Sequence, residues 1–469
     1  MFRGGSRLVV RKFARLLVVV LLLSGAAPLH AGGHISRLGK IGAPAVIHAG
    51  ALLDVPGQTP RAQSTIAIAE GKIIAVAEGY REPAYFSEFK EPADVIIVDL
   101  RDSFVLPGLM DAHVHIMAQP STFVNNARSG GGPISKSDLA LTGSVYAQRT
   151  LAAGFTTVRD VGSNDESVFA LRDAINQGLL PGPTILASGP TLSATGGHGD
   201  RGFGASKSLD AEIRRAEGVC DGVTECTAAV RHNIKLGADL IKFTATGGFM
   251  SDTGTQLQYE LDEMQAIVST AHMRGIKVAA HAYAADAVRI ALDAGVDSIE
   301  HGWMLDATAL KQMKKQGTYL VPTLLISRPS AWANMAGTGR GAAQRDEFQS
   351  FEKAYEMGVN IAFGTDVGIY DHGQNALEFN VMTELGMSNA DAIRSATTAT
   401  ADLFGLGAEL GSIEAGKRAD IIAVEADPLA DITVLQNVQF VMKSGAILKE
   451  QGEYLGVVTT RPAAKPVKF

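Results

Sequence analysis

Six residues with metal-ligand side chains stand at points along this chain where short apolar runs end. They are His113, His115, Lys242, His281, His301 and Asp366. Four imidazoles, one amine and one carboxylate form a complete ligand set for two divalent metal ions. Bound divalent ions activate water for attack on polar bonds. The set therefore predicts hydrolysis at a metal centre.

The spacing of the four histidines fits strand ends. His113 and His115 are two residues apart in D-A-H-V-H, which places both imidazoles on one face of a strand. His281 and His301 are separated by about one strand–helix unit, so they are expected on adjacent strands. Any one of these histidines alone is more often structural than functional. Their occurrence together favours a metal site.

Lys242 and Asp366 complete the ligand set. Lys242 lies inside the β-type run L-I-K-F, where burial and nearby cations would lower its pKa and leave a nucleophilic amine. Such an amine can take up carbon dioxide, and the resulting carbamate offers one oxygen to each ion. The alternative is an ordinary ion pair with Asp239. Asp366 can bind an ion and accept a proton from water, or it can cap a helix.

Several other side chains are candidates for contact with a substrate. Tyr283 follows His281 by two residues, so its phenol shares the same strand face and can polarise a scissile carbonyl. His198, in T-G-G-H-G-D, lies on a loop and can bind a substrate carboxylate or cap a turn. The remaining candidates are His372, Arg328 and Arg159. A structural role is an equal alternative for each.

The central part of the chain alternates between β-type and helical segments. We predict eight strands at 105–109, 156–160, 184–188, 240–244, 278–281, 298–301, 319–323 and 361–366. Helices are expected between them, and several end at glycines that tolerate a left-handed cap conformation. Eight consecutive strand–helix units predict an α/β fold, a closed TIM-like (β/α)8 barrel with its active site at the carboxyl ends of the strands.

The two chain ends are rich in short β-strands and turns. Strands are predicted at 46–53, 64–69, 72–77 and 95–100, and again at 419–424 and 438–444. We therefore expect one small β-sandwich domain built from both ends; two separate β extensions are the alternative. The predicted organisation is a signal peptide at 1–31, β-sandwich parts at 32–104 and 404–469, and a barrel at 105–403.

The first 31 residues resemble a secretory signal peptide. Five basic residues precede the apolar run 16–23, and small residues follow it up to Ala31. We expect a periplasmic or secreted protein without a stable membrane anchor, although an uncleaved anchor is the alternative. Removal of the segment takes five positive charges from a net charge of −7 and leaves −12, which makes nucleic acid an unsuitable partner. Cys220 and Cys226 can form a disulfide or remain free thiols.

The order His-x-His, Lys, His, His, Asp on eight strands resembles the amidohydrolase superfamily. The segments P-G-L-M-D-A-H-V-H, I-K-F-T-A-T-G-G and G-S-I-E-A-G-K-R-A-D-I-I-A-V carry the likeness over nearly the whole mature chain. Within it, A-G-F-T-T-V-R-D-V-G and H-A-Y are similar to the Xaa-Pro dipeptidase and aryldialkylphosphatase-related group. That group includes peptidases that release a C-terminal amino acid and enzymes that degrade ochratoxin A.

The resemblance implies two divalent ions, with zinc the expected metal. It assigns His113, His115 and Asp366 to one ion and His281 and His301 to the other, with carboxylated Lys242 bridging them. It implies cleavage of an amide or peptide bond by a metal-bridging hydroxide, in a short peptide or small molecule. Homo-oligomers, octamers among them, occur in the superfamily. Alternatives are an esterase, lactonase or cyclic-amide hydrolase on the same site, or a non-catalytic barrel scaffold.

Overall fold

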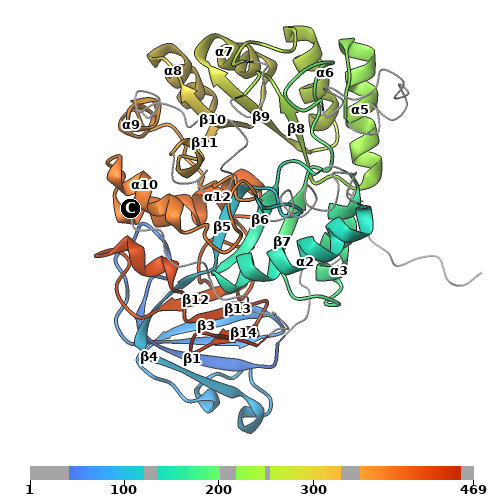
Figure 1. The fold of residues 1–469 in the computed structure, drawn as a ribbon. Helices are drawn as coiled ribbons and strands as arrows, with labels where there is room; N and C mark the ends of the chain where they lie inside the picture. Colours follow the sequence, from blue (N-terminus) through green and yellow to red (C-terminus); the bar gives the residue numbers. More distant parts are fainter. Residues whose placement is uncertain are drawn as a thin grey trace, which may run out of the picture. The chain divides into compact units, whose positions relative to one another are not determined.

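An eight-stranded sheet combines strands from both ends of the described chain (Figure 1). Its strand order is β15-β14-β13-β12-β4-β1-β2-β3, and β1 and β4 are its parallel pair. The strands are β1 Ala45–Leu52, β2 Ser64–Ala69, β3 Lys72–Glu78, β4 Ile96–Pro107, β12 Ile421–Val424, β13 Phe440–Lys443, β14 Ala446–Glu450 and β15 Glu453–Tyr454. The two β-rich ends therefore meet in one sheet, while the expected sandwich of two sheets is not shown.

The computed structural model describes residues 42–120, 135–163, 165–200, 218–248, 254–328 and 349–455. The predicted signal peptide at 1–31 lies outside these ranges. None of the helices in the described ranges is long and apolar enough to cross a membrane. The domain boundaries expected from the sequence stay a prediction.

Seven parallel strands carry most of the predicted ligand residues. They form a three-stranded sheet, β5-β6-β7, and a four-stranded sheet, β8-β9-β10-β11. The strands are β5 Leu109–Val114, β6 Phe155–Asp160, β7 Thr184–Ala187, β8 Leu240–Thr244, β9 Lys277–Ala284, β10 Ser298–Met304 and β11 Tyr319–Val321. Isolated backbone contacts, such as the bridge between Leu192 and Phe243, join the two sheets. A single closed eight-stranded barrel is not observed among the described residues.

The predicted eighth strand, 361–366, does not form a regular strand. Ile361 bridges Leu320, and Ala112 donates its backbone N–H to Phe363, so the segment lies between β11 and β5. The ladder is interrupted because Phe363 donates instead to Ser395, beyond the two strands. The segment nevertheless reaches the carboxyl end of β5, where the backbone N–H of Asp366 donates to His113 at 2.7 Å.

Helices follow the strands in the order that the sequence predicts. They are α2 Lys136–Ala152, α3 Ser167–Asn176, α5 Gly222–Leu236, α6 Leu261–His272, α7 Ala285–Ala294, α8 Ala307–Gln316, α9 Gln349–Glu356, α10 Leu377–Glu384, α11 Asn389–Ser395 and α12 Thr398–Phe404. Gly237 and Gly295 end α5 and α7 with φ values of 104° and 92°. These left-handed caps are where the sequence places glycine.

Strand β4 of the end sheet leads directly into β5, with Gly108 between them. A Cβ at Gly108 would lie 2.3 Å from Oγ1 of Thr156, so glycine is needed for this close approach. Apolar side chains such as Leu109 and Val114 are fully buried along β5. This packing fixes the strand that carries His113 at its end.

The two cysteines form a disulfide. Cys220 precedes α5 and Cys226 lies within it, with their Cα atoms 5.0 Å apart. Both side chains are buried, and the backbone N–H of Cys220 donates to Ser193. The bond therefore ties the start of α5 to the loop that follows β7.

Candidate active site

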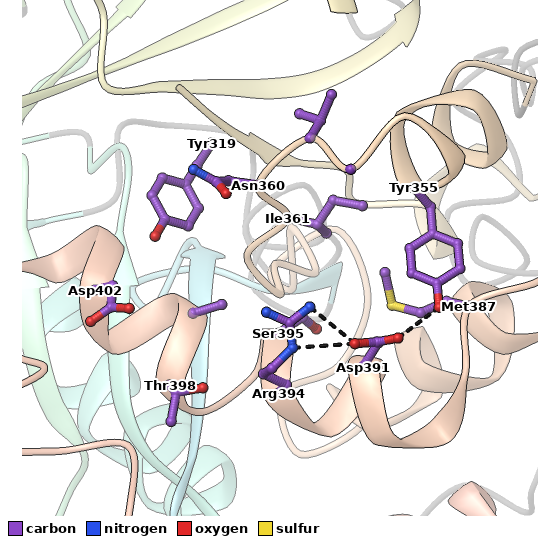
Figure 2. A pocket seen from close by; sticks show the side chains of 13 residues that line it. Tyr319, Tyr355, Asn360, Ile361, Met387, Asp391, Arg394, Ser395, Thr398 and Asp402 are labelled. Atoms are coloured by element: carbon purple, nitrogen blue, oxygen red, sulfur yellow. Dashed lines mark hydrogen bonds and ion pairs between the residues drawn. The ribbon is translucent and has the colours of Figure 1, made fainter. Parts of the chain in front are cut away.

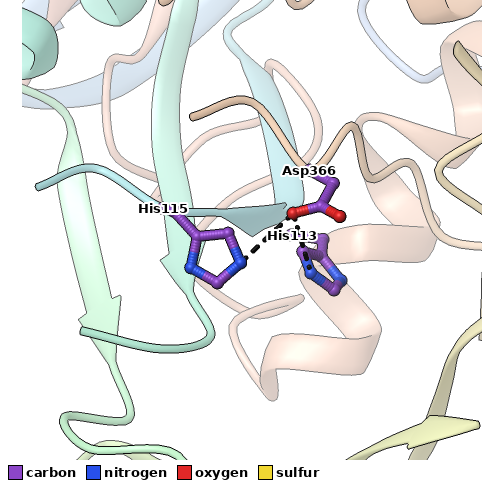
Figure 3. Close-up of side chains that lie close together, drawn as sticks. All are labelled: His113, His115 and Asp366. Carbon is purple, nitrogen blue, oxygen red and sulfur yellow. Dashed lines mark ion pairs between the residues drawn. The ribbon is translucent and has the colours of Figure 1, made fainter. Parts of the chain in front are cut away.

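Three of the predicted ligands converge at the carboxyl end of β5 (Figure 3). Oδ1 of Asp366 lies 3.1 Å from Nε2 of His115 and 3.5 Å from Nε2 of His113. One ligand atom from each of the three residues lies within 4.8 Å of the others. His113 and Asp366 are buried, and His115 is partly exposed. This spacing suits a single metal ion held between the three side chains.

The hydrogen bonds of the two imidazoles determine which nitrogen faces Asp366. Nδ1 of His115 lies 2.7 Å from the carbonyl oxygen of Gly162, and Nδ1 of His113 lies 2.7 Å from Oε2 of Glu300. Both partners are acceptors, so each Nδ1 carries hydrogen and donates. The Nε2 atoms therefore direct lone pairs at Asp366 unless they are protonated.

Oδ1 of Asp366 is buried and has no hydrogen-bond donor. Two imidazole nitrogens and one carboxylate oxygen thus face one another with no hydrogen atom between them. Because their lone pairs repel one another, this arrangement requires a proton or a metal cation between them. Burial alone would lower the pKa of His115, but the Asp366 carboxylate, with smaller effects of Asp160 and the Gly162 carbonyl, raises that pKa. The cluster attracts positive charge, as expected for a metal site.

His281 and His301 lie beside this cluster. Their ring centroids are 4.6 Å apart, and the His301 ring lies 5.0 Å from that of His113. Nε2 of His281 faces the carbonyl oxygen of Gly247 at 3.1 Å, which leaves its Nδ1 available as a ligand. Burial, more than any neighbouring charge, holds the pKa of both histidines well below its ordinary value. They are neutral, as metal ligands must be.

Lys242 lies in the middle of β8 with its side chain buried. Burial lowers the pKa of its amine to about 8, although the carboxylates of Glu300 and Asp366 oppose the shift. Its positive charge in turn lowers the pKa values of His281 and His301. The amine is therefore near both halves of the cluster and is readily deprotonated. The alternative ion pair with Asp239 is not formed, since Asp239 accepts from Arg172 at 2.7 Å.

A buried carboxylate, Glu300, supports the site from behind. Its Oε2 accepts from His113, and its Oε1 accepts from Arg159 and Ser298 at 2.7 and 2.5 Å. The Arg159 guanidinium, after the cost of burial, holds the pKa of Glu300 well below its ordinary value. Glu300 was not among the residues predicted from the sequence, although a charged residue in a buried strand such as S-I-E-H must have a partner. Arg159 is buried in this pair, which fits the structural alternative given for it.

The backbone is strained at three residues of the site. His301, Thr323 and Asp366 have φ values of 71°, 47° and 59°, in the left-handed region that side chains other than glycine disfavour. Nδ1 of His301 lies 2.7 Å from Oγ1 of Thr323, so two of the strained residues are hydrogen-bonded to each other. Strain of this kind persists only where surrounding contacts enforce it.

Tyr283 and His198 both contact the histidine group. The Tyr283 ring stacks on His301 with centroids 5.1 Å apart, and it meets His281 edge to face. The His198 ring stacks on His281 at 4.4 Å, and its backbone N–H donates to Gln258. Both predicted contact residues therefore lie beside the second pair of histidines.

Two other candidates serve the fold. His372 is buried, and its Nε2 donates to the carbonyl oxygen of Ala118 at 2.9 Å. Its ring stacks on Tyr146. Arg328 forms an ion pair with Glu384 at 2.5 Å. The hydrogen bonds of His372 and the ion pair of Arg328 fit the structural alternatives given for them.

A cavity of about 370 Å³ lies away from this cluster. It is lined by Tyr319, the first residue of β11, and by residues of α11 and α12 (Figure 2). Within it, Asp391 accepts from both Arg394 and Tyr355. None of the predicted ligands lines this cavity, which contacts the amino end of β11 at Tyr319.

The buried imidazoles, carboxylate and amine form a candidate metal site on a parallel α/β fold, and such sites are typical of hydrolases. The model of the amidohydrolase family matches residues 104–448, and the chain belongs to this family. As a member of it, the protein is a hydrolase that acts on amide bonds.

Proteins of known name are similar over most of the chain. Ochratoxinase from Aspergillus niger is 30% identical over 439 residues, covering 87% of each chain. The crystal structure of a Xaa-Pro dipeptidase with bound methionine is 38% identical, with a TM-score of 0.78, and covers 87% of this chain and 100% of its own. A prolidase complexed with N-methylphosphonate-L-proline is 31% identical with a TM-score of 0.74, at the same coverage.

Proposed function

We propose that this protein is an exported two-metal amidohydrolase that releases the C-terminal amino acid of a dipeptide, an N-acyl amino acid or an ochratoxin A-like amide. The convergence of His113, His115 and Asp366 on one point, with His281, His301 and Lys242 beside them, carries the proposal. The relatives add support for the substrate class, because methionine and a proline derivative are bound in two of the similar structures.

In this proposal His113, His115 and Asp366 would hold one ion, and His281 and His301 would hold the other. Two divalent ions there, zinc as the expected metal, would polarise a scissile carbonyl and make a water molecule acidic. With a pKa of about 8, about one tenth of the Lys242 amine is neutral at pH 7. This neutral amine would add carbon dioxide and release a proton to form a carbamate, which would offer one oxygen to each half of the site. Carboxylation of this amine is part of the proposal. The closed (β/α)8 barrel and the β-sandwich that the sequence predicts are proposed as well.

The proton transfers fall to Asp366. The neighbouring His113 and His115, against the effect of burial, hold the pKa of its carboxyl well below the ordinary value, so it is ionised and able to accept. It takes a proton from the attacking water and returns it to the leaving amine. The Tyr283 phenol, on the adjacent face, donates to the carbonyl oxygen as negative charge develops there. His198 binds the carboxylate of the substrate.

Export is supported by the basic and apolar segment at 1–31. The disulfide between Cys220 and Cys226 agrees with it, since such bonds persist in oxidising compartments. We propose a periplasmic or secreted location without a stable anchor, and a homo-oligomer in solution. Cell fractionation and light scattering on the purified protein test these two points.

The first experiment is mass-spectrometric product analysis with zinc-loaded protein lacking residues 1–31. The panel holds N-acyl amino acids, Xaa-Pro and other dipeptides, and ochratoxin A, each beside its ester analogue. We expect a free C-terminal amino acid, with turnover lost in Lys242→Ala and Asp366→Asn. Lys311→Ala and Asp293→Asn make the same changes at exposed positions and serve as matched controls.

Three results would change the proposal. Cleavage of the esters alone would indicate an esterase or lactonase on the same site. Near-wild-type turnover in Asp366→Asn and Lys242→Ala would contradict the scheme. A purified protein that binds no metal and cleaves nothing in the panel would point to a non-catalytic scaffold.

A further inference from the structure

Two buried polar residues at the start of helix α10 lie behind the candidate metal centre. Asn375 stands just before the helix and Glu378 is its second residue, and both side chains are 0% exposed. Neither residue belongs to the predicted ligand set. Buried polar groups need hydrogen-bond partners. The partners of these two residues connect them to different halves of the centre.

Asn375 leads to the half that contains His113 and Asp366. Its Nδ2 donates to Oδ2 of Asp111 at 2.8 Å. The same oxygen accepts from Oγ1 of Thr365 at 2.6 Å, while Oδ1 accepts from the backbone N–H groups of His113 and Thr365 at 3.0 and 3.2 Å. Asp111 therefore joins β5 to the segment that carries Asp366, and Asn375 fixes the orientation of that carboxylate.

Glu378 leads to the half that contains His301. Its two oxygens accept from the consecutive backbone N–H groups of Leu324 and Leu325 at 2.6 and 2.8 Å. The preceding residue is Thr323, which has a φ of 47° and whose Oγ1 lies 2.7 Å from Nδ1 of His301. Glu378 thereby holds the strained turn that orients the His301 ring.

The opposite side of the same turn is also held. The indole N–H of Trp303 donates to the carbonyl oxygen of Pro322 at 2.8 Å. Pro322 and Leu324 are thus fixed on either side of Thr323, which is fully buried. A residue in the left-handed region costs about 1–3 kcal/mol, so contacts such as these must enforce it.

We infer that the start of α10, together with Asn375 just before it, is a shared brace for the metal centre, in which Asn375 positions the His113–Asp366 half through Asp111 and Glu378 positions the His301 half through Thr323. Both are positioning residues, since neither touches a ligand side chain. The inference rests on the two-ion centre of the proposed function. It adds that the two halves are held by separate hydrogen-bond chains from one helix end.

Two isosteric substitutions break these chains one at a time. Asn375→Asp replaces the donor that faces Asp111 by an acceptor. Glu378→Gln replaces one acceptor that faces a backbone N–H by a donor. Asn380→Asp, on the solvent side of the same helix, and Glu352→Gln, exposed on α9, make the same chemical changes away from the centre.

The measurement is ion binding, followed without substrate. Elemental analysis gives zinc per polypeptide, and competition with a chelator gives the dissociation constants of the two binding steps. We expect each variant to weaken one step by about 10- to 100-fold and to leave the other within about threefold. The double variant should lose both steps, and the two control variants should match the wild type. Far-UV circular dichroism of each protein verifies that it is folded.

Variants that remove a threonine hydroxyl test the inference if Asn375→Asp or Glu378→Gln fails to fold. Thr323→Val and Thr365→Val interrupt the two chains without altering α10, whereas Thr323→Ser and Thr365→Ser retain the hydroxyl and should restore binding. Unchanged affinities at both steps, or an equal loss at both steps in either single variant, would overturn the inference, as would a wild type that binds fewer than two ions. Tight binding of two ions without amide cleavage would refute the proposed function and leave the brace intact.

Discussion

The imidazole of His113 donates from Nδ1 to the carboxylate of Glu300 at 2.7 Å. This one contact fixes the tautomer, because the remaining nitrogen must then present its lone pair to Asp366. Glu300 is itself held by Arg159 and Ser298. The ligand is thus oriented by a buried ion pair before any metal arrives.

Glu300→Gln should weaken metal binding and lower stability together. The variant leaves Arg159 buried without a charged partner, which typically costs about 3–5 kcal/mol. Loss of the carboxylate behind a ligating histidine typically lowers metal affinity by about 10- to 100-fold. Denaturant unfolding of the metal-free protein and chelator competition measure the two effects. A variant with wild-type values in both would show that Glu300 does not support the site.

Carboxylation of Lys242 should depend on pH around 8. Only the neutral amine takes up carbon dioxide, and burial lowers the pKa of this amine to about 8. The neutral fraction therefore falls about tenfold per pH unit below that value. Metal-free protein equilibrated with ¹³C-bicarbonate should show a carbamate carbon signal that grows from pH 6 to pH 9. The same signal in Lys242→Met would assign it to another amine and remove Lys242 from this role.

Tyr283→Phe should separate turnover from binding. The ring that stacks on His301 is retained, so zinc content should not change. Loss of a hydrogen-bond donor to the developing oxyanion should lower kcat by about 10²- to 10³-fold with little change in KM. Tyr355→Phe removes a phenol that donates to Asp391 and is the matched control. Full activity in Tyr283→Phe would exclude its phenol from catalysis.

Lys443 should make the stability of the protein depend on pH. Burial, with a smaller effect of Arg418, lowers the pKa of this amine to about 7, and its Nζ donates to the carbonyl oxygen of Gly182 at 2.9 Å. Between pH 7 and about 10 the unfolded chain holds a proton that the folded protein lacks. The free energy of unfolding should therefore rise with pH in this range, by up to about 1.4 kcal/mol per unit from this residue.

Lys443→Met should flatten that rise, whereas exposed Lys311→Met should preserve it. Urea unfolding at several pH values from 7 to 9.5 gives the slopes. Identical slopes in wild type and Lys443→Met would show that the amine is not the titrating group.

The clustering of His113, His115 and Asp366 could be predicted because each candidate ligand interrupts an apolar run near its end. Strand β8, which carries Lys242, was predicted with its observed bounds. Glu300 could not be found in this way, since its partners His113 and Arg159 are 187 and 141 residues away in sequence. The sequence pattern indicates which residues are buried. It does not indicate which distant residue forms the hydrogen bond or ion pair that a buried polar residue needs.

The eighth segment shows a second limit of sequence patterns. The apolar run before Asp366 predicts a strand, yet Phe363 donates to Ser395 and Asp366 takes a φ of 59°. Tertiary hydrogen bonds decide both features. Similarly, the polar residues of the α10 brace, Asn375 and Glu378, look like ordinary surface residues of a helix start until the fold is known.

Strand β12 pairs with β4 from Ile421 to Val424, and β4 leads through Gly108 into the strand of His113. Ribosomes make chains from the amino terminus. Strand β4 therefore cannot pair with β12 until nearly nine-tenths of the polypeptide has been synthesised. If the chain is exported unfolded, its ions are acquired only after translocation. Zinc supply in the outer compartment, rather than in the cytosol, would then set how much of the secreted protein is active.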